Sequence, residues 1–484
     1  MHPYFTITNA VVLSLYVVSF LLVAHFTVFG IVGLFKRKIF PHTDKKLRYG
    51  IIIGARNEQA VITNLIQSIQ ASDYPQDKIQ IFVVAHNCTD QTAEAARAAG
   101  ATVYEYNNPD ECTKGYAARY LFEQIEKDYG VMNYDGFITL DADNVLDRKF
   151  MEKMNDAFVA SGERAVVTSF RNSKTFGTNV ISAMYGLYFV QGCRIESRGR
   201  TVVGCSTRVQ GTGYLVPAKV VEHGWNYVTL TEDWELTADQ VLEGTPILYC
   251  DEAVTFDEQP TDVHIMWRQR LRWAKGHLLV GIGRFGDVVR ALFTPKKKNP
   301  NLHKYSVFDL GMNIYPSLIV FVVILLIQNI FVWLSPLFGR SILDSYLAAL
   351  PSTLLGFGFY YVFTMLVTTM IYIVERKRIH KFNPLIRIGS IVLMPLFLGV
   401  SFVLATVALF TKNISWKPIP HQDTTDLATL VAKDKALLGE EYGSTEEVAE
   451  NTTEDTTEDT TEDTTEDTTE DTTEDTTEGF ADAQ

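Results

Sequence analysis

The stretch FITLDADNVLD, residues 137–147, holds the first side chains whose spacing suggests chemistry. A β-rich run delivers Asp141 and Asp143 at its carboxyl end, and alternation along an extended chain places both carboxylates on one side. Two carboxylates at one strand end are costly to bring together unless a cation lies between them. Because Mg²⁺ binds one or two carboxylates together with phosphates, the pair suits a divalent cation on a diphosphate. A polar turn that ends the strand is the alternative.

A second pair of acids lies in TLTEDWELT, residues 229–237. Glu232 and Asp233 follow an uncharged segment and precede a helical pattern. A carboxylate in such a place can act as a general base that takes a proton from a hydroxyl group. Thr231 and the two acids can equally form an ordinary helix start, with no catalytic role.

The third stretch, QRLRWAKG at residues 269–276, places Arg270, Arg272 and Lys275 around Trp273. Its apolar and cationic residues have helical spacing, which is typical of an amphipathic helix on anionic lipid with snorkelling side chains. A guanidinium also binds a diphosphate through two parallel hydrogen bonds, and an indole face suits the apolar face of a sugar ring. The stretch therefore fits either a lipid surface or a site for a leaving diphosphate and an acceptor sugar.

Alternating strands and helices must position these side chains. Strand patterns occupy residues 48–58, 78–87, 101–107 and 137–144, and helical patterns occupy residues 58–72 and 92–100. This alternation predicts an α/β domain with a mostly parallel sheet covered by helices. Such sheets bind ligands beyond the carboxyl ends of their strands, which is where Asp141 and Asp143 fall.

Four apolar stretches, at residues 6–34, 305–338, 342–374 and 385–410, are long enough to cross a bilayer. Basic residues follow the first stretch, and the link at residues 375–387 between the last two is strongly basic, so the positive-inside rule places both in the cytoplasm. We therefore expect a multi-pass cell-membrane protein whose cytosolic domain is inserted between N-terminal and C-terminal transmembrane helices. One late stretch could be re-entrant, so the number of C-terminal spans stays open.

These patterns divide the chain into six parts. We expect an N-terminal transmembrane helix at 1–36, a cytosolic domain at 45–262, amphipathic interface helices at 263–300, a C-terminal transmembrane region at 305–411, a cytosolic or membrane-proximal segment at 412–450 and a disordered acidic tail at 451–484.

Charge is distributed unevenly along the chain. The net charge is −14, but residues 421–484 hold 22 acidic residues against two lysines, which leaves +6 for the remainder. The tail repeats TTED six times from Thr452 to Asp475 with no apolar residue, so we expect it to be disordered and solvated, with a partner- or ion-binding element as the alternative. Five cysteines without ligand spacing are expected to be reduced thiols.

An ordered set of motifs links these stretches: GARNE, NCTDQTAEAA, TKGYA, DAD, QGTG, TED and QRLRW. In this order, between about Tyr49 and Gly276, the chain resembles the membrane-integrated, processive members of glycosyltransferase family 2, which include cellulose, hyaluronan, chitin and poly-N-acetylglucosamine synthases. The resemblance implies a Rossmann-like GT-A domain, a UDP-sugar donor and a Mg²⁺ or Mn²⁺ cofactor.

The resemblance also implies roles for individual residues. Asp233 is the expected general base, with Glu232 beside it, and Asp143 is the expected metal ligand. The acceptor is expected at Gly211, Thr212, Gly213 and Trp273. The nucleotide-sugar is expected at Ala55, Arg56, Asn57, Glu58, His86, Lys114, Asp141, Gln269 and Arg272.

His86 departs from the family pattern, because many members have an acidic residue there that contacts uracil. A neutral imidazole can both donate and accept, so pairing with uracil remains possible. The segment WKPIPH, residues 416–421, resembles the family's loop near the active site. If all three late stretches cross the membrane, however, this loop would face outward, and the sequence leaves that conflict open.

The resemblance implies a processive, inverting enzyme that polymerises a UDP-sugar, with UDP-glucose and a β-glucan preferred, and secretes the chain through its own channel. Aromatic residues of the late stretches, Tyr360, Tyr361, Phe363 and Tyr372, are expected either to line that channel or to pack against lipid. The alternatives are hyaluronan or poly-N-acetylglucosamine synthesis, single transfer to a lipid-linked acceptor, and a non-catalytic export scaffold. The expected partners are the growing polysaccharide and the lipid bilayer, with no nucleic acid.

Overall fold

The computed structural model describes residues 3–295, 297–314, 317–379, 382–412, 414, 419, 421–430 and 432. Its strands are β1 (Tyr49–Ala55), β2 (Ile79–His86), β3 (Thr102–Tyr106), β4 (Gly136–Asp141), β5 (Val145–Leu146), β6 (Val166–Ser173), β7 (Tyr214–Pro217) and β8 (Ile247–Asp257). Its helices are α1 (Pro3–Phe35), α2 (Ile62–Gln70), α3 (Thr92–Ala98), α4 (Lys114–Asp128), α5 (Phe150–Ala160), α6 (Val180–Gln191), α7 (Arg198–Val202), α8 (Glu232–Glu243), α9 (Val263–Phe293), α10 (Lys304–Ile314), α11 (Ser317–Leu334), α12 (Ile342–Glu375) and α13 (Pro384–Phe410). The predicted tail at 451–484 lies outside the described residues.

The eight strands form one sheet in the order β3-β2-β1-β4-β7-β6-β8-β5. The predicted parallel arrangement is found in β3, β2, β1 and β4, and β6 pairs with β8 in the same sense. Strand β7 runs antiparallel to β4 and to β6, and β5 runs antiparallel to β8, so the sheet as a whole is mixed.

Alternation along β1 builds the core on both faces of the sheet. Ile51 and Ile53 pack beneath α2 and α5, whereas Ile52 packs with α4 on the opposite face. At Gly50 a Cβ atom would lie 2.6 Å from the ring of Phe137 on β4, so only glycine allows that ring to pack across the strand. All five cysteines are free thiols, as expected.

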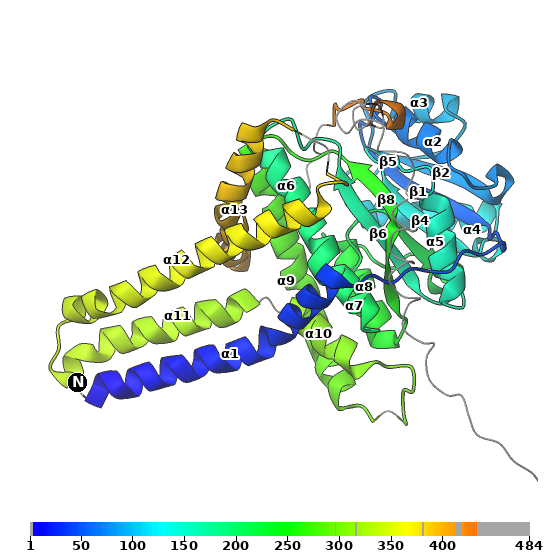
Figure 1. Ribbon diagram of the computed structural model, residues 1–484. Coiled ribbons are helices and arrows are strands. Elements are labelled where there is room, and N and C mark those ends of the chain that lie inside the picture. The colour runs from blue at the N-terminus through cyan, green and yellow to red at the C-terminus, as the bar shows by residue number, and fades with distance from the viewer. Residues whose placement is uncertain are drawn as a thin grey trace, which may run out of the picture. The chain divides into compact units, whose positions relative to one another are not determined.

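A bundle of helices projects away from the sheet. Helices α1, α11 and α12 run alongside one another, and η5 (Ser335–Phe338) joins α11 to α12 at the end remote from the sheet (Figure 1). Two stretches, Leu354–Glu375 and Pro384–Phe410, are long and apolar enough to cross a membrane by length and composition. The span expected at residues 6–34 coincides with α1, and its crossing stays a prediction.

Buried ion pairs fasten this bundle to the sheet. Arg194 bonds to Glu375 at the end of α12 at 2.5 Å, and Arg378 contacts Asp251 of β8 at 3.2 Å. Arg200 of α7 bonds to Asp309 of α10 at 2.7 Å, and His25 of α1 lies 3.0 Å from the same carboxylate. Removing one partner would leave a buried charge unpaired, so these pairs fix the placement of the helices.

Helix α13 lies against the sheet domain along its length. Near its start, a Cβ atom on Gly389 would lie 3.2 Å from Val180 of α6. Near its end, Lys275 of α9 donates to the carbonyl oxygen of Ala408 at 3.1 Å. Beyond it the chain returns to the sheet, where Asn64 of α2 donates to the carbonyl oxygen of Thr424.

Candidate functional site

A cavity of about 580 Å³ lies at the carboxyl ends of β1, β2 and β4, and α8, α9 and α13 enclose its other sides. Most of the predicted site residues line it: Ala55, Arg56, Glu58, His86, Lys114, Asp141, Asp143, Gly211, Glu232, Asp233, Gln269, Arg272 and Trp273. Residues that are up to about 220 positions apart in the chain thus meet in one chamber.

Three predicted residues do not line the cavity but shape it from behind. Asn57 accepts from the backbone N–H of Thr89 at 2.8 Å and joins the loops after β1 and β2. Thr212 accepts from the backbone N–H of Asp141 at 2.9 Å. Gly213 has φ of 63°, and a Cβ atom there would lie 2.4 Å from the hydroxyl of Ser169, so a side chain has no room.

An ion pair occupies the sheet side of the cavity. Lys114, the first residue of α4, bonds to Asp141 at 2.5 Å and donates to the carbonyl oxygen of Gly211 at 2.8 Å. Burial opposes the charge on Lys114, but Asp141 and Glu232 outweigh it and raise the Lys114 pKa. Burial likewise opposes the charge on Asp141, and Lys114 outweighs it and lowers the Asp141 pKa. Both groups are therefore charged at neutral pH.

Oxygen ligands for a cation gather next to this pair. Asp143 is 5% exposed, and its Oδ2 accepts from the backbone N–H of Glu258 at 2.8 Å. Burial raises the pKa of Glu58 to about 7, and the nearby charges of Asp143 and Asp141 add to the rise. Carboxylate oxygens are the ligands that Mg²⁺ and Mn²⁺ prefer, so the chemistry of Asp143 fits the expected cofactor.

The segment after α13 closes this side of the cavity. His421 Nδ1 lies 2.9 Å from Glu58 Oε1, and the backbone N–H groups of Gln422 and Asp423 donate to the Glu258 carboxylate at 3.1 and 2.9 Å. Burial lowers the pKa of His421, but Asp143 and Glu58 outweigh burial and raise it to about 10. The end of the WKPIPH segment thus lies at the site; residues 415–418 and 420 are outside the described part of the chain.

The two acids of the TED motif lie in the first turn of α8. Burial raises the pKa of Asp233 and of Glu232, although Lys114 opposes both rises. Thr231 makes no side-chain cap bond, whereas Asp233 Oδ1 accepts from the Trp234 backbone N–H at 2.9 Å. Of these residues, only Asp233 caps the start of the helix. Its other oxygen, Oδ2, lies next to Gly211, where a Cβ atom would be 3.5 Å from it.

The cations of QRLRWAKG divide into two groups. Arg272 faces the carboxylates of Glu232 and Asp233 and donates to the Leu230 carbonyl oxygen at 3.3 Å. Arg270 instead donates to the Phe397 carbonyl oxygen of α13 at 2.6 Å, and Lys275 also bonds to α13. Arg272 therefore faces the two acids, whereas Arg270, which also lines the cavity, and Lys275 bond to α13.

Two further residues of QRLRWAKG, Gln269 and Trp273, line the cavity. Gln269 Oε1 is buried without a hydrogen-bond partner, which leaves it available to a ligand. Trp273 packs edge-on against Tyr185 and Phe189, each with ring centroids 6.2 Å away, so its orientation is fixed before any ligand binds.

At the nucleotide side, His86 stacks on Tyr106 with ring centroids 5.4 Å apart. Its Nε2 lies 2.7 Å from the Glu111 carbonyl oxygen, a distance that requires the proton on Nε2. Burial lowers its pKa, so the ring is neutral near pH 7. A neutral imidazole at His86 is the state that the sequence analysis considered for pairing with uracil.

Other cavity residues were not predicted from the sequence. They include Arg171, Tyr188, Arg208, Glu258 and His277. Arg171 bonds to Asp257 at 2.5 Å and Arg208 bonds to Glu196 at 3.1 Å, so both guanidinium groups are already paired. No motif marks these positions, and only the meeting of distant elements brings them to the site.

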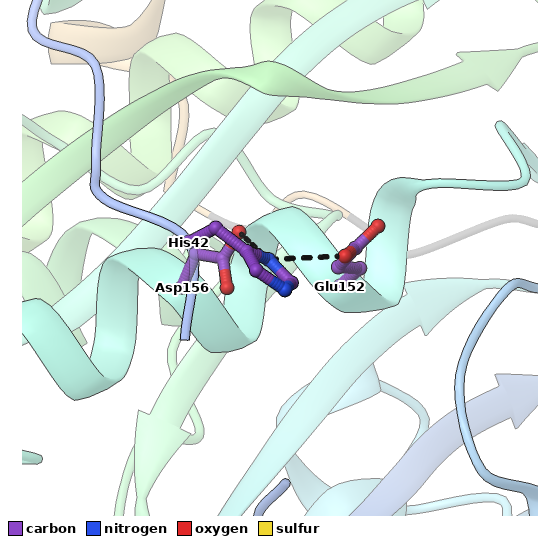
Figure 2. Close-up of side chains that lie close together, drawn as sticks. All are labelled: His42, Glu152 and Asp156. Atoms are coloured by element: carbon purple, nitrogen blue, oxygen red, sulfur yellow. Dashed lines mark ion pairs between the residues drawn. The ribbon is translucent and has the colours of Figure 1, made fainter. Parts of the chain in front are cut away.

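A separate group of possible metal ligands lies outside the cavity. His42 Nδ1 is 3.1 Å from Glu152 Oε1 and 3.5 Å from Asp156 Oδ2, and the two acids are one turn apart on α5 (Figure 2). The Thr43 backbone N–H also donates to Asp156 at 3.1 Å. These contacts attach the linker between α1 and β1 to α5, and none of the predicted site residues belongs to this group.

Comparison with known proteins identifies relatives of the domain that forms this cavity. Residues 47–276 match the family model described as glycosyltransferase like family 2. The chain is 27% identical over 262 residues to a β-monoglucosyldiacylglycerol synthase of Synechocystis sp., covering 50% of each protein. It is 23% identical over 240 residues to the poly-β-1,6-N-acetyl-D-glucosamine synthase of Staphylococcus aureus, covering 46% of this chain and 53% of that one. The chain thus spans about half the length of the curated relatives it matches.

Among solved structures, the fold is similar to that of a mannosyltransferase from Pyrobaculum calidifontis, determined with GDP-Man and Mn²⁺. The TM-score is 0.51 at 15% identity, over 82% of this chain and 99% of the other. At this identity the likeness establishes a shared fold, and the region of the family match contains β4, which ends at Asp141, and the turn that carries Asp143.

Proposed function

Because residues 47–276 form a glycosyltransferase family 2 domain, we propose that the protein transfers a hexose from a UDP-sugar, with inversion, to an acceptor hydroxyl in this cavity. One observation carries the proposal: the Lys114–Asp141 pair and Asp143 face the same chamber as Asp233 and Arg272. The groups proposed to bind the charged leaving group thus line the same cavity as the buried base.

The sheet side would hold the nucleotide. His86 and Arg56 would contact the uracil end, and Lys114 and Asp141 would contact the sugar diphosphate. Asp143 would hold the divalent cation, which stabilises the charge on the departing diphosphate when it is bound. Gln269 and Arg272 would approach the donor from the α9 side.

Two residues would perform the chemistry on the opposite side. As the bond between C1 of the hexose and the diphosphate oxygen breaks, negative charge develops on the leaving group, and the Arg272 guanidinium would stabilise it. The acceptor oxygen forms its bond to C1 from the other face and gives its proton to Asp233. Burial raises the pKa of Asp233, which makes it a stronger base than an exposed aspartate.

We propose that the protein lies in the cell membrane with this domain in the cytoplasm. The basic segment that follows α12 supports a cytoplasmic domain, because its Arg378 bonds to Asp251 of that domain. Helices α1, α11 and α12 would cross the bilayer. Both ends of α13 contact the domain, so α13 would stay on the cytoplasmic side, and the conflict over the WKPIPH segment disappears.

Processive synthesis of a β-glucan is the finer proposal, and the fixed indole of Trp273 supports it as a platform for a sugar ring. The aromatic residues of α12 give a secretion channel less support. Tyr360 and Tyr361 donate to carbonyl oxygens of α13 at 3.0 and 2.6 Å, and Phe363 is 56% exposed on the outer surface. Single transfer to a lipid is therefore a second candidate, and the glucolipid synthase among the relatives favours it.

The test is incubation of the purified protein in lipid with a panel of labelled UDP-hexoses and Mg²⁺ or Mn²⁺. We expect cation-dependent release of UDP with at least one donor, and product length then separates polymerisation from single transfer. Binding of UDP-sugars without any release of UDP would instead support a non-catalytic scaffold.

A further inference from the structure

The two ends of the cavity differ in polarity. Charged groups surround the donor end, whereas apolar side chains of α9, α11 and α13 line the opposite end: Leu278, Leu326, Leu404, Ala405 and Leu409. Leu326 is 57% exposed and Leu409 is 52% exposed. The cavity therefore opens between these helices onto the outer surface of the protein, at an apolar mouth formed by these five residues.

Exposed apolar side chains continue around the apolar mouth. On α9, Ile282 is 67% and Phe285 is 57% exposed; on α13, Val403 is 52% and Phe410 is 83% exposed. Exposed apolar side chains on α9 and α13, two helices that pack against each other, are suited to contact with lipid. A soluble oligosaccharide that left through this mouth would place its hydroxyl groups against hydrocarbon without partners, which is costly.

The base beside the acceptor position limits the chemistry of the acceptor. A lipid phosphate is already ionised at neutral pH and has no proton that Asp233 must remove. It would also lie next to the carboxylates of Glu232 and Asp233, which repel it. Arg272 faces the same two carboxylates, but the proposed function assigns its guanidinium to the leaving diphosphate, and the guanidinium groups of Arg208 and Arg270 are bonded to Glu196 and to α13. An alcohol, by contrast, needs the base and adds no charge.

We propose that the acceptor is a membrane lipid with a free hydroxyl group, which enters through the apolar mouth with its hydrocarbon between α9 and α13. This inference rests on the proposed function and specifies its acceptor. The lipid oxygen forms the new bond to C1 of the hexose, the diphosphate leaves with the electrons of the old bond, and Asp233 takes the hydroxyl proton. The product is a neutral glycolipid that remains in the bilayer.

The experiment compares acceptors offered to the full-length protein. The protein is placed in phosphatidylcholine vesicles that contain diacylglycerol, undecaprenyl phosphate, soluble cello-oligosaccharides or no addition, with labelled UDP-hexoses and Mn²⁺. We expect the label to enter the organic phase only with diacylglycerol. Label that enters the organic phase only with undecaprenyl phosphate, or that accumulates only as polymer, would overturn the inference.

Release of UDP distinguishes failure of the lipid acceptor from failure of the transferase function. If UDP is released in every arm at one rate and no lipid is labelled, the acceptor inference fails while the proposed transferase function stands. If no arm releases UDP, both fail.

A matched pair of variants tests the apolar mouth itself. Leu409→Asp places a charge at the mouth, and we expect the ratio of lipid transfer to UDP release to fall at least about tenfold, because hydrocarbon must then pass a carboxylate. Leu396→Asp is the control, since Leu396 is 48% exposed on the same helix but does not line the cavity. Equal ratios in the two variants, with both folded, would show that lipid does not use this mouth.

Discussion

The donor end and the membrane end of the cavity are built by different means. The donor end consists of side chains at the carboxyl ends of neighbouring strands, and ion pairs such as Lys114–Asp141 hold them in place. The membrane end consists of helices from distant parts of the chain, joined by bonds such as that from Arg270 to Phe397. In the proposed function, recognition of the nucleotide would therefore depend on short motifs, and recognition of the acceptor on how helices pack.

The largest expected effect lies where the two ends meet. Asp233→Asn removes the base, and we expect transfer to fall by about 10²-fold or more while UDP binding is kept. Glu232→Gln is the matched control, because Glu232 lies 3.9 Å from Lys114 on the donor side and should lose less. Initial rates of UDP release measure both variants, and equal losses would place the base elsewhere.

The donor end can be tested through its cation. Asp143→Asn removes the expected metal ligand, and we expect a loss of about 10²-fold in transfer, because the charge on the leaving diphosphate is then poorly stabilised. Electron paramagnetic resonance of Mn²⁺ with UDP reports binding independently of activity. Unchanged Mn²⁺ affinity in this variant would contradict the assignment of Asp143.

The segment that closes the donor end should respond to pH. The pKa of His421 is raised to about 10, above its ordinary 6.5, so the stabilisation from its charge is complete below about pH 6.5 and is lost as the pH rises through about 10. We expect segment 421–430 to detach in that upper range, with faster amide hydrogen exchange and a KM for the donor that rises severalfold. His421→Gln should show the weaker docking without the pH dependence; a full pH dependence in that variant would assign the titration to another group.

The smallest effect is expected far from both ends. His42→Ala removes an imidazole that is 54% exposed beside Glu152 and Asp156, and contacts of this kind contribute up to about 1 kcal/mol. We expect a small decrease in the free energy of unfolding and no change in UDP release, measured by denaturant titration and by activity. A stability that depends on added Zn²⁺ in the wild type, and not in the variant, would show instead that this group binds metal.

The sequence predicted the half of the fold whose pattern is local. The strands that became β1, β2, β3 and β4 are buried apolar runs separated by helices, and a parallel sheet follows directly from that alternation. The position of β7 did not follow, because its four residues pair with β4 and β6 only after the chain has passed through α6 and α7.

The site shows the same limit. Residues in motifs, such as Lys114 and Asp143, line the cavity, and their binding roles stay predictions. Glu258 has no motif around it, and its role in holding Gln422 and Asp423 depends on a segment that returns to the sheet after α13. Such contacts arise from long-range packing, which one sequence read by local pattern does not reveal.

The buried arginines behind the sheet determine how the protein can be handled. Arg200 is 2% exposed and its partner Asp309 belongs to α10, while Arg194 depends on Glu375 at the end of α12. Expression of residues 47–276 alone would remove both acids and leave the two arginines without these ion-pair partners. Recombinant production of a stable catalytic unit thus requires the helices that follow it, together with a detergent or lipid that covers them.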